Sequence, residues 1–380
     1  MTRHHVYLDH NATTPLRAEA AAAMTDAMAV LGNPSSVHRA GRAARRVVED
    51  ARERVAALAG ATPAAVIFTS GGTEANALGL AGCGRRRVLV SAVEHVSVLD
   101  AVPGARRLPV DRNGVVALDA LAEALADGGP PAVVSVMLAN NETGVIQPVA
   151  AVAELAARHG AIVHCDAVQA AGKVPLDLAA LGVHSLAVSA HKIGGPSGSG
   201  ALITTAEVVT PLLRGGGQER RRRPGSENVV GIAGFGAAAA AVGDRAHLRG
   251  AADSLERLRD RLEARLMTVT PGARIAGAGA ARLANTTCFI VPGVAAETLV
   301  MALDLAGVAA SAGSACSSGK VASSHVLEAM DFARDASYAG VRVSTGWTTT
   351  QHDIDTFVDA WSALAHRLGL AATPDMTAAA

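Results

Sequence analysis

Short apolar runs alternate with alanine-rich stretches of helical periodicity between about residues 43 and 240. Residues 43–59 have apolar positions at helical spacing with Arg and Glu between them, and they end at Gly60, which predicts a helix. The predicted strands lack polar alternation and lie at residues 65–69, 88–91, 132–137, 161–164 and 186–188. Because strands buried on both faces have this pattern, we expect an α/β domain with a parallel or mixed sheet covered by helices.

The pattern changes near residue 250. Residues 251–267 predict one long charged helix, followed by fewer strands and by a Gly/Ser-rich loop at residues 311–324. We therefore expect a smaller domain to begin near residue 245. A chain of 380 residues suits a large domain with a smaller one beside it.

Composition and charge narrow the class of protein. The formal net charge is zero, which gives no indication of binding to nucleic acid or to an anionic membrane. No run approaches the roughly 20 apolar residues of a membrane span, and the first ten residues lack the apolar core of a signal peptide, so we expect a cytoplasmic protein. The four cysteines form no C-x-x-C pair, which argues against a structural zinc site, and three of them sit beside apolar neighbours and are expected to be buried.

Polar residues follow two of the predicted buried strands. Residues 70–76 (SGGTEAN) lie between a strand and a helix, so backbone N–H groups near Gly72 and Thr73 could face a phosphate, although an ordinary tight turn explains this segment equally well. Asp166 ends another strand, where a carboxylate needs a cation such as a protonated pyridine nitrogen, unless it caps a helix. Gln169 could reach the same face and donate to a phenolate oxygen.

Three further residues are candidates for catalysis. Lys192 ends a strand among small residues, where a desolvated amine can form an imine, although a lone lysine is more often on the surface. His95 could stack on a pyridine ring and shuttle protons, or it could be structural. Cys316 lies amid Ser, Gly and Ala, where a thiol is either reactive or incidental. The order of phosphate loop, acidic residue and lysine favours an enzyme that binds pyridoxal 5′-phosphate (PLP).

Nearly the whole chain resembles the cysteine desulfurases of the class V aminotransferase family. Besides the segments already described, five more carry the resemblance: residues 7–14 (YLDHNATT), 32–38 (GNPSSVH), 140–144 (NNETG), 215–219 (GGGQE) and 341–344 (VRVS). It implies the PLP-dependent transferase fold type I, an α/β fold. The large domain, residues 13–245, would hold a mixed, mostly parallel sheet, and residues 1–12 and 246–380 would form a smaller α+β domain carrying the Cys316 loop.

The resemblance also implies a role for each candidate residue. PLP would be joined to Lys192, with its ring nitrogen on Asp166, its phenolate near Gln169, and His95 stacked on the ring. The residues expected around the rest of the cofactor are Gly72, Thr73, Ser189 and His191 for the phosphate, Ser226 for the phosphate of the neighbouring subunit in a homodimer, and Asn141 near the ring. Arg342 would bind the substrate carboxylate, with Asn33 as a second substrate contact.

The implied reaction removes sulfur from L-cysteine and leaves L-alanine. Lys192 would take the Cα proton, and Cys316 would become a persulfide that passes sulfur to an acceptor protein, such as a scaffold for iron–sulfur clusters. No metal site of its own is expected, although Cys316 could share a cluster bound to such a scaffold. A selenocysteine lyase or aminotransferase of the same fold is the alternative activity, and a non-catalytic scaffold is disfavoured because all the key residues are present. The chain departs from the family pattern at Ser197, where a lysine is usual, and at Pro224.

Overall fold

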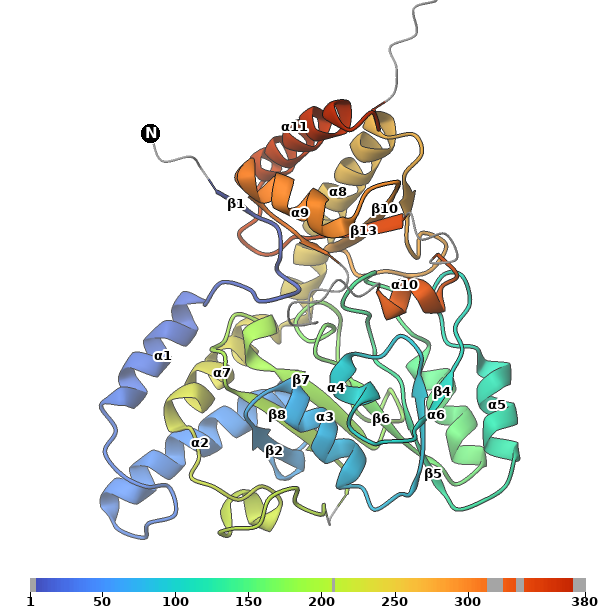
Figure 1. Cartoon of the computed structure of the whole chain (residues 1–380). Coiled ribbons are helices and arrows are strands. Elements are labelled where there is room, and N and C mark those ends of the chain that lie inside the picture. The colour runs from blue at the N-terminus through green and yellow to red at the C-terminus, as the bar shows by residue number, and fades with distance from the viewer. Residues whose placement is uncertain (1–4, 207–208, 313–323, 333–337, 372–380) are drawn as a thin grey trace, which may run out of the picture.

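The computed structural model describes residues 5–206, 209–312, 324–332 and 338–371. A large lobe holds the main sheet, and a smaller lobe contains the last third of the chain together with the N-terminal strand (Figure 1). The helix α7 ends at Val242 and α8 begins at Arg245, close to the predicted boundary between the two domains. The domain division itself stays a prediction.

The large lobe is built on a seven-stranded sheet with the order β2-β8-β7-β6-β5-β3-β4. Its strands are β2 (Val66–Thr69), β3 (Arg87–Ser91), β4 (Arg106–Leu108), β5 (Ala132–Ser135), β6 (Ile162–Asp166), β7 (Ser185–Ser189) and β8 (Gly200–Thr204). The pairs from β4 to β7 are parallel, whereas β8 runs antiparallel to both β7 and β2. The predicted mixed, mostly parallel sheet is therefore confirmed.

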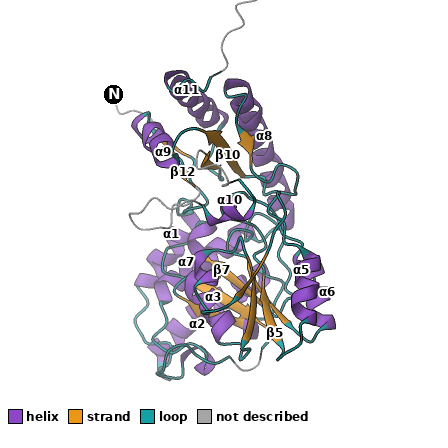
Figure 2. Ribbon diagram, turned by 45° about the vertical axis from the view of Figure 1, so that its right-hand side comes forward, coloured by secondary structure: helices purple, strands orange, loops and turns teal. Residues whose placement is uncertain are grey.

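Helices cover both faces of this sheet, and Figure 2 shows them on either side of the strands. They are α1 (Ala18–Met28), α2 (Arg39–Leu58), α3 (Gly72–Ala81), α4 (Val96–Leu99), α5 (Leu118–Ala126), α6 (Val149–Arg158) and α7 (Val229–Val242), with short 3₁₀ turns η1 (Pro63–Ala65), η2 (Ala190–Lys192) and η3 (Gln218–Arg221). Along β2, Phe68 packs into the core under α2 and α7, while its neighbour Ile67 packs against α3. Successive strand residues face opposite sides, so burial of both faces explains the unbroken apolar runs in the sequence.

The small lobe contains a four-stranded antiparallel sheet of order β12-β13-β10-β9. Its elements are α8 (Arg245–Val269), β9 (Arg274–Ile275), β10 (Thr286–Pro292), α9 (Ala296–Leu305), β11 (Val308–Ala309), β12 (Ser311–Ala312), α10 (His325–Ala329), β13 (Tyr338–Ser344) and α11 (Gln351–Arg367). The N-terminal strand β1 (Val6–Tyr7) pairs in parallel with β11. The core of the small lobe includes a cluster of aromatic residues. Phe289 packs edge-on against Trp361, with 4.8 Å between ring centroids, and against Phe357.

Two observations bear on the composition. Within the described residues, no helix is both long enough and apolar enough to cross a membrane. Cys165 and Cys288 are buried as expected, whereas the expected burial of Cys83 is wrong. Cys83 follows the end of α3, where its thiol contacts the Leu80 carbonyl oxygen and remains partly exposed.

Candidate active site

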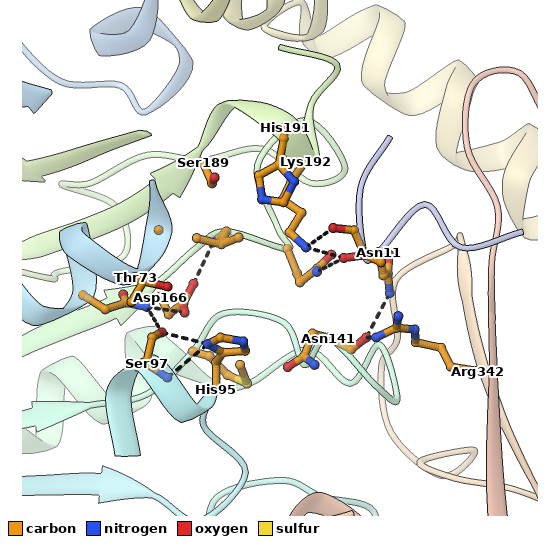
Figure 3. Close-up of a pocket in the computed structure, with 16 residues that line it drawn as sticks. Asn11, Thr73, His95, Ser97, Asn141, Asp166, Ser189, His191, Lys192 and Arg342 are labelled. Atoms are coloured by element: carbon orange, nitrogen blue, oxygen red, sulfur yellow. Dashed lines mark hydrogen bonds between the residues drawn. The ribbon is translucent and has the colours of Figure 1, made fainter. Parts of the chain in front are cut away.

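A cavity of about 330 Å³ lies where β6 and β7 end and α3 begins (Figure 3). The carboxyl ends of parallel strands meet at one edge of a sheet, which gathers their terminal polar residues. Ten of the residues predicted for the site line this cavity: Gly72, Thr73, His95, Asn141, Asp166, Gln169, Ser189, His191, Lys192 and Arg342. The residues on the facing wall come from the N-terminal segment and from β13 of the small lobe.

The N-terminus of α3 forms one end of the cavity. The first N–H groups of a helix have no carbonyl partner within that helix, so those of Gly72 and Thr73 are available to an anion. A Cβ on Gly72 would lie 2.8 Å from the Val168 side chain, so glycine keeps this end open. The nearby Glu74 carboxylate is paired with Arg223 at 2.8 Å and does not oppose an anion there. This arrangement fits a phosphate group better than it fits an ordinary turn.

Asp166 ends β6 and is only 5% exposed. One carboxylate oxygen accepts a hydrogen bond from the Asn76 side chain at 2.7 Å, and the other accepts the Val168 backbone N–H at 2.9 Å. A turn follows Asp166, not a helix, so helix capping does not account for this residue. A buried carboxylate that faces a cavity fits a cationic ring nitrogen.

Lys192 lies in η2, just after β7, and its side chain points into the cavity (Figure 3). Its Nζ donates to the carbonyl oxygens of Asn11 and Ala12, at 2.5 and 2.7 Å. Burial and the charge of Lys192 lower the pKa of the adjacent His191 to about 4, so that imidazole is neutral. Together with the Ser189 hydroxyl, it adds neutral polar groups to the cavity wall.

His95 precedes α4 and lines the opposite wall. Its Nδ1 accepts the Ser97 backbone N–H at 3.1 Å, so in the neutral ring the proton is on Nε2. Burial lowers the pKa of His95, with a smaller opposing effect from Asp166. A neutral imidazole in the cavity wall adds no charge, which suits stacking on an aromatic ring.

Arg342 comes from β13 and is 4% exposed. Its guanidinium donates to an oxygen of Asp9 at 2.7 Å and to the Asn141 carbonyl oxygen at 3.1 Å. Among the described residues its buried Nε has no hydrogen-bond partner. A guanidinium that lines a cavity and is held by the two contacts to Asp9 and Asn141 fits a carboxylate ligand.

Two of the predicted residues, Asn33 and Ser226, do not line the cavity. Asn33 and Ser226 are exposed, and Asn33 uses its side-chain oxygen to accept the Ser35 backbone N–H. Cys316 lies outside the described residues. Within those residues no cluster of His, Cys, Asp or Glu is arranged to hold a metal ion.

Several polar residues of the site were not predicted from the sequence. Asn11 accepts hydrogen bonds from Lys192 and Gln169 through its backbone oxygen, and Asn76 holds Asp166. Asn76 follows Gly72 by one helical turn, a spacing that could have indicated it. Lys173 donates to the side-chain oxygen of Gln169 at 2.8 Å, four residues away.

The chain is similar over most of its length to known proteins. Residues 6–357 match the family model for class-V aminotransferases. The chain is 42% identical to a cysteine desulfurase of Cereibacter sphaeroides, over 93% of this chain and 94% of the relative. It is 40% identical to an IscS-like cysteine desulfurase of Mycobacterium tuberculosis, over 92% and 93%. The solved structure of a NifS-like protein from Rickettsia africae superposes with a TM-score of 0.87 at 33% identity, covering 96% of this chain and all of that one.

Proposed function

The chain belongs to the class V aminotransferase family and is a PLP-dependent cysteine desulfurase, and we propose that it removes sulfur from L-cysteine in the cavity between α3, β6 and β7. The observation that carries this assignment is the joint placement of Lys192, Asp166 and the α3 N-terminus around one space of about 330 Å³. An amine, a buried carboxylate and an anion site are the three features that a phosphorylated pyridine aldehyde requires.

The residues that would hold PLP follow from their positions. Its phosphate would lie on the N–H groups of Gly72 and Thr73, near Ser189 and His191. Asp166 would face the ring nitrogen and Gln169 the phenolate, with His95 and Asn141 beside the ring. When bound, PLP supplies an electron sink for the substrate carbon.

The substrate is oriented by Arg342. Its guanidinium lines the cavity and would bind the carboxylate of L-cysteine. The contacts to Asp9 and Asn141 fix the position of the guanidinium, so that the bound substrate would direct its Cα toward Lys192. Lys192 would take the Cα proton at Nζ and return a proton later, which leaves L-alanine as the product.

Cys316 would act as the sulfur acceptor. Its thiolate attacks the sulfur of cysteine, so that an S–S bond forms while the substrate C–S bond breaks and its electron pair stays with the carbon. Both described flanks of the Cys316 segment support this role: in β12, Ser311 pairs with Arg342 and the last described residue before the segment, Ala312, pairs with Val341, while Ser324 donates to Glu142, next to Asn141. One flank therefore lies beside Arg342 of the cavity wall, and the other contacts the residue that follows Asn141 of that wall.

We further propose a homodimer in which the exposed Ser226 reaches the phosphate of the neighbouring subunit, with Asn33 as a second substrate contact. The persulfide would pass to a sulfur-acceptor protein, such as a scaffold for iron–sulfur clusters. A cytoplasmic location suits a chain that keeps Cys83, Cys165 and Cys288 as free thiols.

The test is purification with PLP, followed by absorbance spectroscopy and by assays for alanine and protein-bound persulfide. We expect a visible band, alanine formed from cysteine, and a persulfide that disappears in Cys316→Ala while the band remains. Cys83→Ala is the matched control and keeps all three signals. A protein that stays colourless after PLP is added would overturn the assignment, and alanine formation with unchanged persulfide in Cys316→Ala would overturn the role of that thiol.

A further inference from the structure

Lysine is scarce in this chain, and one lysine near the site has no assigned role. Of 34 Lys and Arg residues only three are lysines: Lys173, Lys192 and Lys320. Lys192 lines the cofactor cavity, and Lys320 lies outside the described residues. We propose that Lys173 is a positioning residue, which holds the side-chain amide of Gln169 so that its NH₂ group is presented to the cofactor. This inference rests on the proposed PLP site.

The side-chain amide of Gln169 is hydrogen-bonded at both ends. Lys173 Nζ donates to Gln169 Oε1 at 2.8 Å and to Asn11 Oδ1 at 3.3 Å. At its other end the Gln169 amide donates through Nε2 to the Asn11 carbonyl oxygen at 2.8 Å. An ammonium group can only donate, so it binds the oxygen end of the amide, and the nitrogen end is turned the other way.

This orientation leaves one N–H of Gln169 for the cavity. An amide nitrogen carries two hydrogens, of which the Asn11 carbonyl oxygen accepts one. Gln169 is 4% exposed and lines the cofactor cavity, so the second hydrogen is directed to a ligand there. A cation on Oε1 also polarises the amide and makes this N–H a stronger donor to a phenolate oxygen.

Loss of Lys173 would leave Gln169 Oε1 buried without its cation. The amide would then keep a single anchor, the Asn11 carbonyl oxygen, and could rotate to find another donor for its oxygen. The hydrogen bond offered to the cofactor would weaken because its donor is no longer held in place. Lys173 is thus expected to act through Gln169, without touching the cofactor itself.

The surroundings of Lys173 explain why lysine stands here in a chain that otherwise uses arginine. Lys192 from η2 and Arg342 from β13 face it, and it shares a second cavity, of about 290 Å³, with Lys192 and Arg17. Burial, together with the charges of Lys192 and Arg342, lowers the pKa of Lys173 to about 7, and Lys173 in turn helps to lower the pKa of buried His10. A guanidinium is larger and would be harder to accommodate among these cations, whereas an ammonium is compact and places its charge directly on Gln169 Oε1.

A double-mutant cycle on the PLP-loaded enzyme tests the proposal. Lys173→Met, Gln169→Leu and the double variant are compared with the wild type for the PLP dissociation constant and the wavelength of the visible band. We expect Lys173→Met to weaken PLP binding roughly tenfold, the effect of one lost or misdirected hydrogen bond. The double variant should bind PLP no more weakly than Gln169→Leu, because Lys173 has no other route to the cofactor.

Arg17→Met is the matched control. It removes a cation from the same second cavity without touching Gln169, and the visible band should keep its position. Wild-type binding in Lys173→Met, or additive effects in the double variant, would overturn the role of Lys173 and leave the PLP site intact. A wild-type protein without a visible band would instead overturn the PLP site. Circular dichroism checks folding, and Lys173→Ala takes the place of Lys173→Met if the latter does not fold.

Discussion

Glu142 gives the enzyme a titrating carboxyl group beside its active site. It follows Asn141, is 3% exposed, and accepts a hydrogen bond from the Ser324 hydroxyl at 2.5 Å. The same hydroxyl accepts the Leu327 backbone N–H at the start of α10. Burial raises the pKa of Glu142 from 4.5 to about 7, against the opposing effects of Ser324 and Arg342.

The size of the effect follows from the two pKa values. A rise from 4.5 to about 7 corresponds to about 3 kcal/mol of unfolding free energy, at about 1.4 kcal/mol for each tenfold change in proton affinity. Because the pKa is raised in the folded state, this stabilisation is fully present below pH 4.5 and is lost as the pH rises through about 7. Integration of the linkage relation places about 2 kcal/mol of the loss between pH of about 5.5 and about 8.5.

Glu142→Gln isolates this contribution because glutamine stays neutral at every pH. Equilibrium urea unfolding of the PLP-saturated wild type and variant, at pH of about 5.5 and about 8.5, should show that the wild type loses about 2 kcal/mol more than the variant. Other titrating groups, such as Lys173, are present in both proteins and cancel in the comparison. If both proteins change in parallel between the two pH values, the buried carboxyl group does not titrate as the structure indicates.

Three further substitutions test separate parts of the structure. Asp166→Asn should lower kcat roughly 100-fold, because an amide cannot stabilise a ring cation as a carboxylate does. Steady-state kinetics with PLP in excess measures this effect, and an unchanged kcat would mean that the carboxylate is dispensable. Arg342→Lys should raise KM for L-cysteine about tenfold while the visible band persists, because an ammonium cannot form a bidentate contact with the substrate carboxylate. An equal loss of PLP affinity would indicate that Arg342 binds the cofactor instead. Arg52→Met should cost about 3 kcal/mol in urea unfolding, since it leaves the carboxylate of Glu219, bound at 2.7 and 2.8 Å, buried without its partner. An unaffected unfolding midpoint in that variant would mean that Glu219 finds another cation.

The sequence alone was sufficient for the local features of this enzyme. Strands such as β6 and β7 could be predicted because burial on both faces requires continuous apolar runs. Asp166 and Lys192 could be predicted because polar residues that follow such runs lie at the edge of the sheet where ligands bind. The glycines of the 70–76 segment marked the start of α3 by the same local logic.

The tertiary structure decided which distant residues meet. β8 was missed because its antiparallel insertion between β2 and β7 depends on strand pairing and not on local pattern. The contacts of Arg342 with Asp9, and of Lys192 with Asn11, join segments more than 180 residues apart. Local hydrophobic periodicity cannot predict contacts between such distant segments. Gln169 and Lys173 are only four residues apart, but the sequence does not show that they interact. Their hydrogen bond depends on the fold, which buries Gln169 and places Lys173 near other cations. Hydrophobic patterning therefore determines where the elements form, whereas side-chain orientation and electrostatics at the site depend on how those elements pack.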